Sequence, residues 1–369
     1  MVFASYVDRV CADIRHSQQI AVEMGGKLAS LVDSIYLGGG TPTLLDPDHL
    51  KRIFAAVHSE FAVSDDAEVT VECAPGTLSP ELIETLLSCG VNRMSLGVQS
   101  FIDREAASIG RLHKRDTVFD DIALLRAAGI SNINIDLIAG LPHQTAASWK
   151  KSLEETIGTG APHTSVYMLE VDEDSRLGRE LIAGGTRYHA HFVPSEEAVA
   201  DFYLAACEEL DAGNIRQYEI SNFARPEFES RHNLKYWSRE PYLGFGVDAH
   251  SMLHALAPEF DAVRFSTSDS LESFTGGESL HKTIVTPTNA LEENLFLGLR
   301  LNRGVDLQKI ADHFGSDSLA VLGPIIKQLE ANNLADASGN ILRLTARGRL
   351  LSNEVFQQFL DFDEISTHS

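Results

Sequence analysis

The sequence contains few cysteines, and they are scattered along the chain. Its four cysteines are Cys11, Cys73, Cys89 and Cys207, and no two of them have the short spacing typical of zinc or iron–sulfur ligands. The spacing therefore predicts neither a disulfide framework nor a metal site. We expect reduced thiols that are mostly buried.

Basic residues and long apolar runs are also scarce. The chain has 30 Lys and Arg against 53 Asp and Glu, a formal net charge of -23 at pH 7. So much negative charge repels nucleic-acid backbones and anionic lipids. The N-terminus lacks the apolar core of a signal peptide, and no run reaches the ~18 apolar residues of a membrane span. We expect a soluble, cytoplasmic protein with no nucleic-acid partner and no membrane span, which leaves only peripheral contact with a membrane.

Short apolar runs alternate with amphipathic helical stretches from residue 6 to about residue 170. The runs are SIYLGG, EVTVEC, VNRMSLGVQS, NINIDLIAG and TSVYMLEV. This repeated pattern predicts parallel strands covered by helices. The fold class is therefore α/β, and a length of 369 residues allows a large barrel-type domain plus a smaller one.

Polar residues recur on one face of these predicted strands. Side chains alternate along a strand, so if Val69 and Val71 face the helices, Thr70 and Glu72 face the barrel interior. The next two strands add a polar set to the interior: Arg93, Ser95, Gly97, Gln99, Asn132, Asn134 and Asp136. Barrel interiors usually hold branched apolar residues, so this one is predicted to hold a polar ligand. Alternatively, some of these residues end strands and cap helices.

The chain changes character after residue 171. A polar stretch with His189 and His191 follows, and because no third ligand lies nearby we interpret it as a solvated loop rather than a metal site. From about residue 286, three helical patterns and a short hairpin predict a small winged-helix-like domain. Acidic residues outnumber basic ones there, which favours a structural or docking role over DNA binding.

A glycine-rich turn directly follows the first apolar run. Gly38, Gly39 and Gly40, followed by Thr41, allow a ligand to approach the backbone closely. Alone, such a turn could simply be a tight connection. Four polar residues at or after the following strands strengthen the interpretation as a binding site, namely Glu72, Gln99, Arg111 and Asp136.

The order and spacing of these motifs resemble a known family. GGGTPTLL, ECAPGTL, GVNRMSLGVQSF, IGRLH and INIDLIAGLPHQT resemble the barrel of the coproporphyrinogen-oxidase-like radical S-adenosylmethionine family. The resemblance implies a partial (β/α)6 TIM-type barrel that lacks its first strand. It also implies S-adenosylmethionine as a cofactor, with its amino group at the glycine turn and its polar ends held by Glu72, Gln99, Arg111 and Asp136. Carboxylates and an arginine suit a sulfonium cation with a zwitterionic end.

A second block, QYEISNFARP, RHNLKYW and YLGFGVDAHS, is similar to the segment that distinguishes HemW-like haem chaperones. In these proteins a pattern of His, Asn, two residues, Tyr and Trp is linked to haem; here it comprises His232, Asn233, Tyr236 and Trp237. Imidazole can ligate haem iron and aromatic rings can cover the macrocycle, so the resemblance implies His232 as the iron ligand. By residue chemistry alone, a hydrogen-bonded turn histidine with packed aromatics is an equal alternative.

The resemblance extends through RLTARGRLLSNEVF and implies three parts. They are a radical-SAM-type βα barrel over residues 1–170, barrel completion with the haem-associated segment over 171–285, and a HemN-type C-terminal domain over 286–369.

One departure from the family concerns its iron–sulfur cluster. The family holds a 4Fe-4S cluster on three cysteines spaced Cys, three residues, Cys, two residues, Cys, and this pattern is absent here. The chain begins where the first helix of the family is expected. We expect either a coding start set too far downstream or a natural short form that retains only binding. Radical catalysis is not expected of the sequence as written.

Three functions are compatible with these features. The first is a haem chaperone that binds S-adenosylmethionine in its barrel and delivers haem to acceptor proteins such as respiratory cytochromes. The second is oxygen-independent oxidative decarboxylation of coproporphyrinogen III in porphyrin biosynthesis, for which the lost cluster would be fatal. The third is an unrelated barrel enzyme that uses Glu72 and Asp136 as acid and base. The pattern around His232 favours the first.

Overall fold

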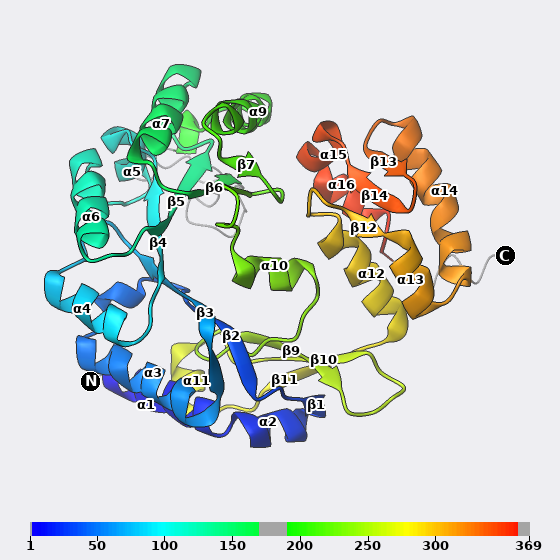
Figure 1. The fold of residues 1–369 in the computed structure, drawn as a ribbon, viewed down its shortest axis with the longest axis horizontal. Coiled ribbons are helices and arrows are strands. Elements are labelled where there is room, and N and C mark those ends of the chain that lie inside the picture. The colour runs from blue at the N-terminus through cyan, green and yellow to red at the C-terminus, as the bar shows by residue number, and fades with distance from the viewer. Residues whose placement is uncertain (1, 170–189, 361–369) are drawn as a thin grey trace. The chain divides into compact units, whose positions relative to one another are not determined.

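The computed structural model of the chain describes residues 2–169 and 190–360 (Figure 1). The chain forms two compact units. We call the first the barrel unit, formed by Ser34–Pro47 and Glu68–Ser230, and the second the composite unit, formed by Met1–Asp33, Asp48–Ala67 and Arg231–Ser369. The three-part division made from the sequence remains a prediction.

A seven-stranded sheet carries the predicted site. Its strand order is β2-β3-β4-β5-β6-β8-β7. β3 (Ala62–Cys73), β4 (Arg93–Gln99), β5 (Asn132–Ala139) and β6 (His163–Met168) are joined by parallel pairing, whereas β8 (Asn222–Ala224) and β7 (Arg216–Gln217) are antiparallel. β2 (Leu31–Leu37) is the edge strand at one end of this sheet. The sheet is therefore open over the described residues, and the predicted α/β fold with a partial barrel is confirmed.

Helices lie between the parallel strands along the chain, as Figure 1 shows. They are α4 (Pro80–Ser88), α5 (Asp103–Ser108), α6 (Arg115–Ala127), α7 (Ala146–Thr159) and, after β6, α9 (Glu196–Ala212). Local sequence explains their limits: Ser79 caps α4 by accepting a hydrogen bond from Leu82 N–H, and Gly90 follows it with a φ of 84°. The short helices η1 (Pro42–Leu44) and η2 (Ala190–Phe192) lie in the connections.

The two faces of the sheet differ as the alternation predicts. Val71, Leu96, Ile133 and Ile135 on the helix-covered face are completely buried. The opposite face carries Ser95, Asn134 and Asp136, which are hydrogen-bonded to one another. The polar interior is therefore confirmed for this part of the sheet.

The composite unit contains helices α1 (Val2–Arg15), α2 (Ser17–Met24), α3 (Pro47–Glu60), α10 (Arg231–Trp237) and α11 (Leu271–Gly276). It also contains an antiparallel sheet in the order β1-β9-β10-β11, made of Gly26–Lys27, His250–Ala255, Ala262–Ser266 and His281–Val285. No helix among the described residues is long and apolar enough to cross a membrane.

The C-terminal part of this unit has the helices and hairpin that its sequence predicts. Its helices are α12 (Pro287–Gly298), α13 (Leu307–Phe314), α14 (Asp317–Ala331), α15 (Ala346–Leu350) and α16 (Ser352–Gln357). β13 (Ala335–Ser338) and β14 (Ile341–Leu344) form the hairpin, and β12 (Val305–Asp306) pairs with β14.

Candidate functional site

The glycine turn after β2 lies against Glu72 of β3. The Tyr36 hydroxyl donates to Glu72 Oε1 at 2.8 Å, and the Gly39 N–H donates to Oε2 at 3.2 Å. A Cβ on Gly38 would lie 2.7 Å from both Glu72 Oε1 and Tyr36 Cε1, so only glycine fits there without a shift. The turn and the carboxylate therefore form one packed unit.

The next two glycines have backbone conformations that favour glycine. Their φ angles are 76° for Gly39 and 126° for Gly40, and a Cβ on either would meet no atom within 4 Å. Their backbone thus borders open space, as the approach of a ligand requires. Thr41, the last residue of the predicted turn, precedes η1 and makes no side-chain cap to it.

Asp136 of β5 is held by two neighbours on the interior face. Ser95 Oγ donates to Asp136 Oδ2 at 3.0 Å, and Asn134 Nδ2 donates to Oδ1 at 2.7 Å. Burial raises the pKa of Asp136 to about 6, while hydrogen bonds from Ser95, Asn134 and Ser165 oppose the rise and the Glu72 charge adds to it. Two carboxylates close enough to repel each other favour a cationic ligand between or beside them.

Gln99 and Arg111 meet over Gly97. The register of β4 against β5 shifts between Leu96 and Gln99, and Gln99 has a φ of 67°. A Cβ on Gly97 would lie 3.2 Å from Gln99 Nε2 and 3.5 Å from Arg111 Nη2. Both side chains therefore lie over β4 two residues beyond Ser95, the partner of Asp136. Glu72 on β3 and Asp136 on β5 thus lie on the two strands that flank β4, and Gln99 and Arg111 both lie beside Gly97 of β4.

These residues fit the ligand chemistry that the sequence suggests. A glycine backbone in open space, two carboxylates and a guanidinium are the groups that a sulfonium cation with a zwitterionic end requires. Their assignment to S-adenosylmethionine remains a prediction.

The predicted haem motif lies on α10, in the composite unit. The His232 and Tyr236 rings are 5.1 Å apart, edge to face, and the Tyr236 and Tyr242 rings are 4.6 Å apart. The Arg300 guanidinium lies 4.2 Å from the centre of the Trp237 ring. Asn233 lies on the same helix, none of whose residues is buried. The motif therefore presents its imidazole and aromatic rings on a partly exposed helix.

The described thiols offer no site for a cluster. Cys11, Cys73 and Cys89 are buried and Cys207 is half-buried, and none of the four forms a disulfide. Burial raises the pKa of Cys73, on the helix-covered face, to about 11. The described residues contain no group of three His, Cys, Asp or Glu side chains that could hold a metal. Of the two histidines in the polar loop, His191 is exposed in η2 and His189 lies outside the described residues.

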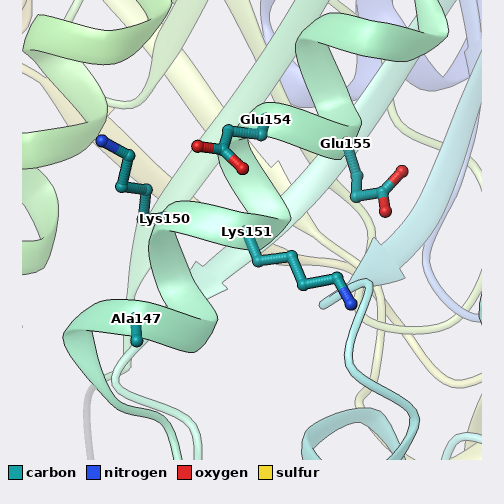
Figure 2. Close-up of a pocket in the computed structure, with 5 residues that line it drawn as sticks. All are labelled: Ala147, Lys150, Lys151, Glu154 and Glu155. Atoms are coloured by element: carbon teal, nitrogen blue, oxygen red, sulfur yellow. The ribbon is translucent and has the colours of Figure 1, made fainter.

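A surface depression of about 490 Å³ lies on α7, apart from the residues predicted for either ligand (Figure 2). It is lined by Ala147, Lys150, Lys151, Glu154 and Glu155, all from one helix. Lys150 pairs with Glu209 at 3.3 Å and Glu155 pairs with Arg115 at 2.8 Å. These are ordinary charged surface contacts, so we assign no site here.

Sequence reasoning missed three side chains that support the site. Tyr36 holds Glu72, while His163 and Tyr218 belong to the hydrogen-bonded network behind Asp136. Carrying the strand alternation from Asn134 and Asp136 into the next strand would have placed His163 on the interior face. Tyr218 gave no such signal because it lies outside the regular strands.

Two family models match parts of the chain. Residues 15–156 match the radical SAM superfamily model, and residues 285–351 match the HemN C-terminal domain model. The chain is 37% identical to the protein named heme chaperone HemW of Bacillus subtilis, over 89% of this chain and 85% of that protein. It is 33% identical to the HemW of Lactococcus lactis, over 90% and 86% of the two chains.

The fold agrees as well. The solved structure of coproporphyrinogen III oxidase (HemN) from Escherichia coli has a TM-score of 0.80 with this chain at 22% identity, covering 97% of this chain and 83% of that one. This likeness establishes the shared fold. With the two domain matches and the HemW relatives, it shows that the chain belongs to the HemW/HemN-like family of radical SAM proteins.

Proposed function

We propose that this protein is a cytoplasmic haem chaperone that binds haem at α10 and delivers it to acceptor proteins such as respiratory cytochromes. The observation that carries the proposal is the arrangement of His232 and Tyr236, which contact each other edge to face on a helix without buried residues. The relatives named heme chaperone HemW support it.

His232 is the proposed iron ligand because a neutral imidazole nitrogen binds haem iron well. Tyr236 and Trp237 supply aromatic surface for the macrocycle. Burial and, to a lesser extent, the neighbouring Tyr242 raise the pKa of Tyr236 to about 12. Asn233 adds a polar side chain beside His232.

We further propose that the barrel unit binds S-adenosylmethionine. When bound, this cofactor supplies a sulfonium cation and an amino acid group. The carboxylates of Glu72 and Asp136 would attract the positive charges, Arg111 would bind the carboxylate, and Gln99 would add a hydrogen bond. The backbone at Gly38, Gly39, Gly40 and Thr41 would accept the amino group. We derive no reaction step from a cluster, since the described residues provide no ligand set for one.

Haem titration followed through the Soret band tests the first proposal. His232→Ala should shift the Soret maximum and weaken binding, because it removes the iron ligand. His191→Ala is the matched control, since it removes an exposed histidine from η2. An unchanged spectrum and affinity for His232→Ala would show that the ligand is another residue.

Delivery needs its own measurement. The haem-loaded chain is mixed with an apo-cytochrome, and transfer is followed by the spectrum of the acceptor. The proposal expects transfer that is faster than the loss of haem to solvent. Equal rates would identify a haem-binding protein that is not a chaperone.

Isothermal titration with S-adenosylmethionine tests the second proposal. Asp136→Ala should weaken binding because it removes one of two carboxylates that attract the cation. Equal heats for the two proteins would remove Asp136 from the site.

A further inference from the structure

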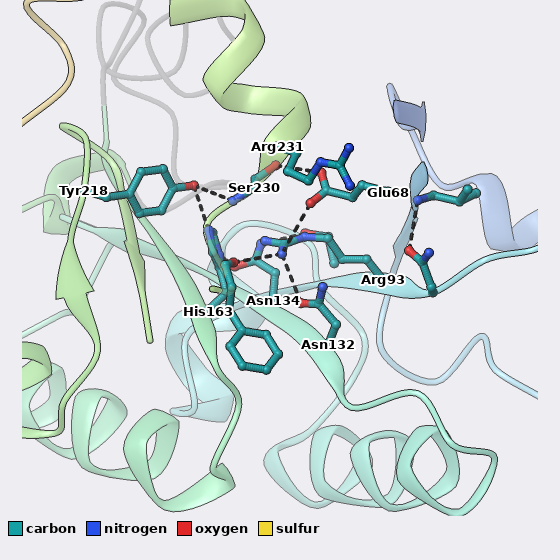
Figure 3. A network of polar contacts seen from close by, with 12 residues as sticks. Glu68, Arg93, Asn132, Asn134, His163, Tyr218, Ser230 and Arg231 are labelled. Carbon is teal, nitrogen blue, oxygen red and sulfur yellow. Dashed lines mark hydrogen bonds and ion pairs between the residues drawn. The ribbon is translucent and has the colours of Figure 1, made fainter. Parts of the chain in front are cut away.

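A chain of hydrogen bonds runs from Ser230 through Tyr218 and His163 to Asn134 (Figure 3). Asn134 continues it to Asp136. The Ser230 N–H donates to Tyr218 Oη at 3.1 Å, and Tyr218 Oη lies 2.9 Å from His163 Nε2. His163 Nδ1 lies 2.6 Å from Asn134 Oδ1, and Asn134 Nδ2 donates to Asp136 Oδ1 at 2.7 Å. His163 is only 1% exposed.

The direction of each hydrogen bond follows from the carboxylate at the end of the chain. Ionised Asp136 can only accept, so Asn134 must turn its NH2 group toward it and its Oδ1 toward His163. An amide oxygen also only accepts, so His163 must carry its proton on Nδ1. Burial, and to a lesser extent the charge of Arg93, lowers the pKa of His163 well below its usual value, so the ring is neutral. Its Nε2 therefore accepts the proton of the Tyr218 hydroxyl.

The orientation of Asn134 also determines its hydrogen bond to Ser95. Its Nδ2 also donates to Ser95 Oγ at 2.7 Å, and Ser95 donates to the second oxygen of Asp136. A reversed amide would place Asn134 Oδ1 against the carboxylate and break both bonds. The orientation of this one amide thus decides whether Asp136 Oδ1 keeps its donor and whether Ser95 Oγ keeps the N–H that it accepts.

We propose that His163 and Tyr218 are positioning residues for Asp136, because they hold Asn134 in the one orientation that fixes this carboxylate for its ligand. The inference rests on the proposed S-adenosylmethionine site. Buried polar groups are costly unless they are paired, and barrel interiors are otherwise filled with branched apolar residues, so a complete polar chain here has a role beyond packing.

Other titratable groups face the same carboxylate. Glu72 of β3 acts on Asp136 through its charge, and Tyr36 of β2 and Tyr167 of β6 have pKa values raised by burial and, to a lesser degree, by that carboxylate. Tyr36 and Tyr167 are neutral at pH 7. The positioning role of His163 therefore concerns hydrogen-bond direction rather than charge.

The first test needs no ligand. Nitrogen-15 NMR of the full chain, with His163→Asn used to assign the signal, should show His163 as a neutral ring protonated on Nδ1. A ring protonated on Nε2, or on both nitrogens, overturns the proposal. The carboxyl carbon-13 signal of Asp136, assigned with Asp136→Asn, should shift in His163→Leu, because Asn134 is released.

The second test is the affinity for S-adenosylmethionine by isothermal titration. His163→Leu removes the donor and should weaken binding about tenfold, the effect of losing one hydrogen bond to a charged group. His163→Asn keeps an N–H donor near the position of Nδ1 and should recover most of the affinity, and Tyr218→Phe should lie between them. Urea unfolding confirms that each variant folds.

A double-mutant cycle separates positioning from general stability. In an Asp136→Ala background, His163→Leu should cause no further loss of affinity, since its effect passes through Asp136. Additive losses, or equal binding by His163→Leu and His163→Asn, overturn the inference. If Asp136→Ala alone leaves binding unchanged, the proposed S-adenosylmethionine site fails, while the two NMR measurements still decide whether His163 positions Asp136.

Discussion

Gly38→Ala should displace the Glu72 carboxylate. The added Cβ would lie 2.7 Å from Glu72 Oε1, 2.8 Å from Glu72 Cδ and 2.7 Å from Tyr36 Cε1. Protein Cβ atoms essentially never make contacts below 3.0 Å, so the carboxylate or the ring must move. Gly38 does not have a left-handed φ, so the effect comes from space and not from backbone strain.

The size of the effect follows from the contacts of Glu72. The carboxylate accepts from Tyr36 at 2.8 Å and from the Gly39 N–H at 3.2 Å. A hydrogen bond to a charged group contributes about 1.5–3 kcal/mol, so losing one of them should weaken S-adenosylmethionine binding by about 10- to 100-fold. The free energy of unfolding should fall by a similar amount.

Isothermal titration and urea unfolding measure both quantities. Gly158→Ala is the matched control, because a Cβ there would meet no atom within 4 Å and the residue lies within α7. It should leave binding unchanged and stabilise the helix by up to about 1 kcal/mol. Adding Glu72→Asp to Gly38→Ala should restore part of the affinity, because the shorter side chain withdraws from the new methyl group. If Gly38→Ala binds as tightly as Gly158→Ala, the placement of Glu72 has no part in binding.

Three further predictions concern stability and dynamics. Burial raises the pKa of Asp136 from 3.8 to about 6, so its ionisation destabilises the fold as pH rises through this range. The free energy of unfolding of Asp136→Asn should therefore rise relative to the wild type by up to about 3 kcal/mol between about pH 4 and pH 7. A pH-independent difference in urea unfolding would contradict this. Arg239 is buried and contacts Asp261 and Glu293, each at 2.5 Å. Arg239→Met should therefore lower the free energy of unfolding by about 3–5 kcal/mol, whereas Arg216→Met, at an exposed arginine, should lower it by about 0–1 kcal/mol. Equal losses of stability would refute a buried network. Hydrogen exchange should be faster in β2, at the sheet edge, than in β5, at its centre, and equal protection would oppose that.

The sequence by itself was enough for the alternation of strands and helices from β2 to β6. Alternating apolar residues at Ile133, Ile135 and Leu137 predicted a covered face, and the same period placed Asn134 and Asp136 on the other. Both features arise from interactions close in sequence, namely the two-residue period of a strand and the preference of glycine for tight turns. The family resemblance was carried by the same local motifs.

The partners of the site residues were decided only by the tertiary structure. Tyr36 and Glu72 are 36 residues apart, and His163 and Tyr218 are 55 residues apart. Arg111, in the loop after α5, approaches Gly97 of β4, and the pairing of β4 with β5 shifts register before Gln99. No local pattern predicts either feature. Such contacts depend on how neighbouring strands align and on which side chains then fill the space between them. These are properties of the packed sheet and not of any one of its segments.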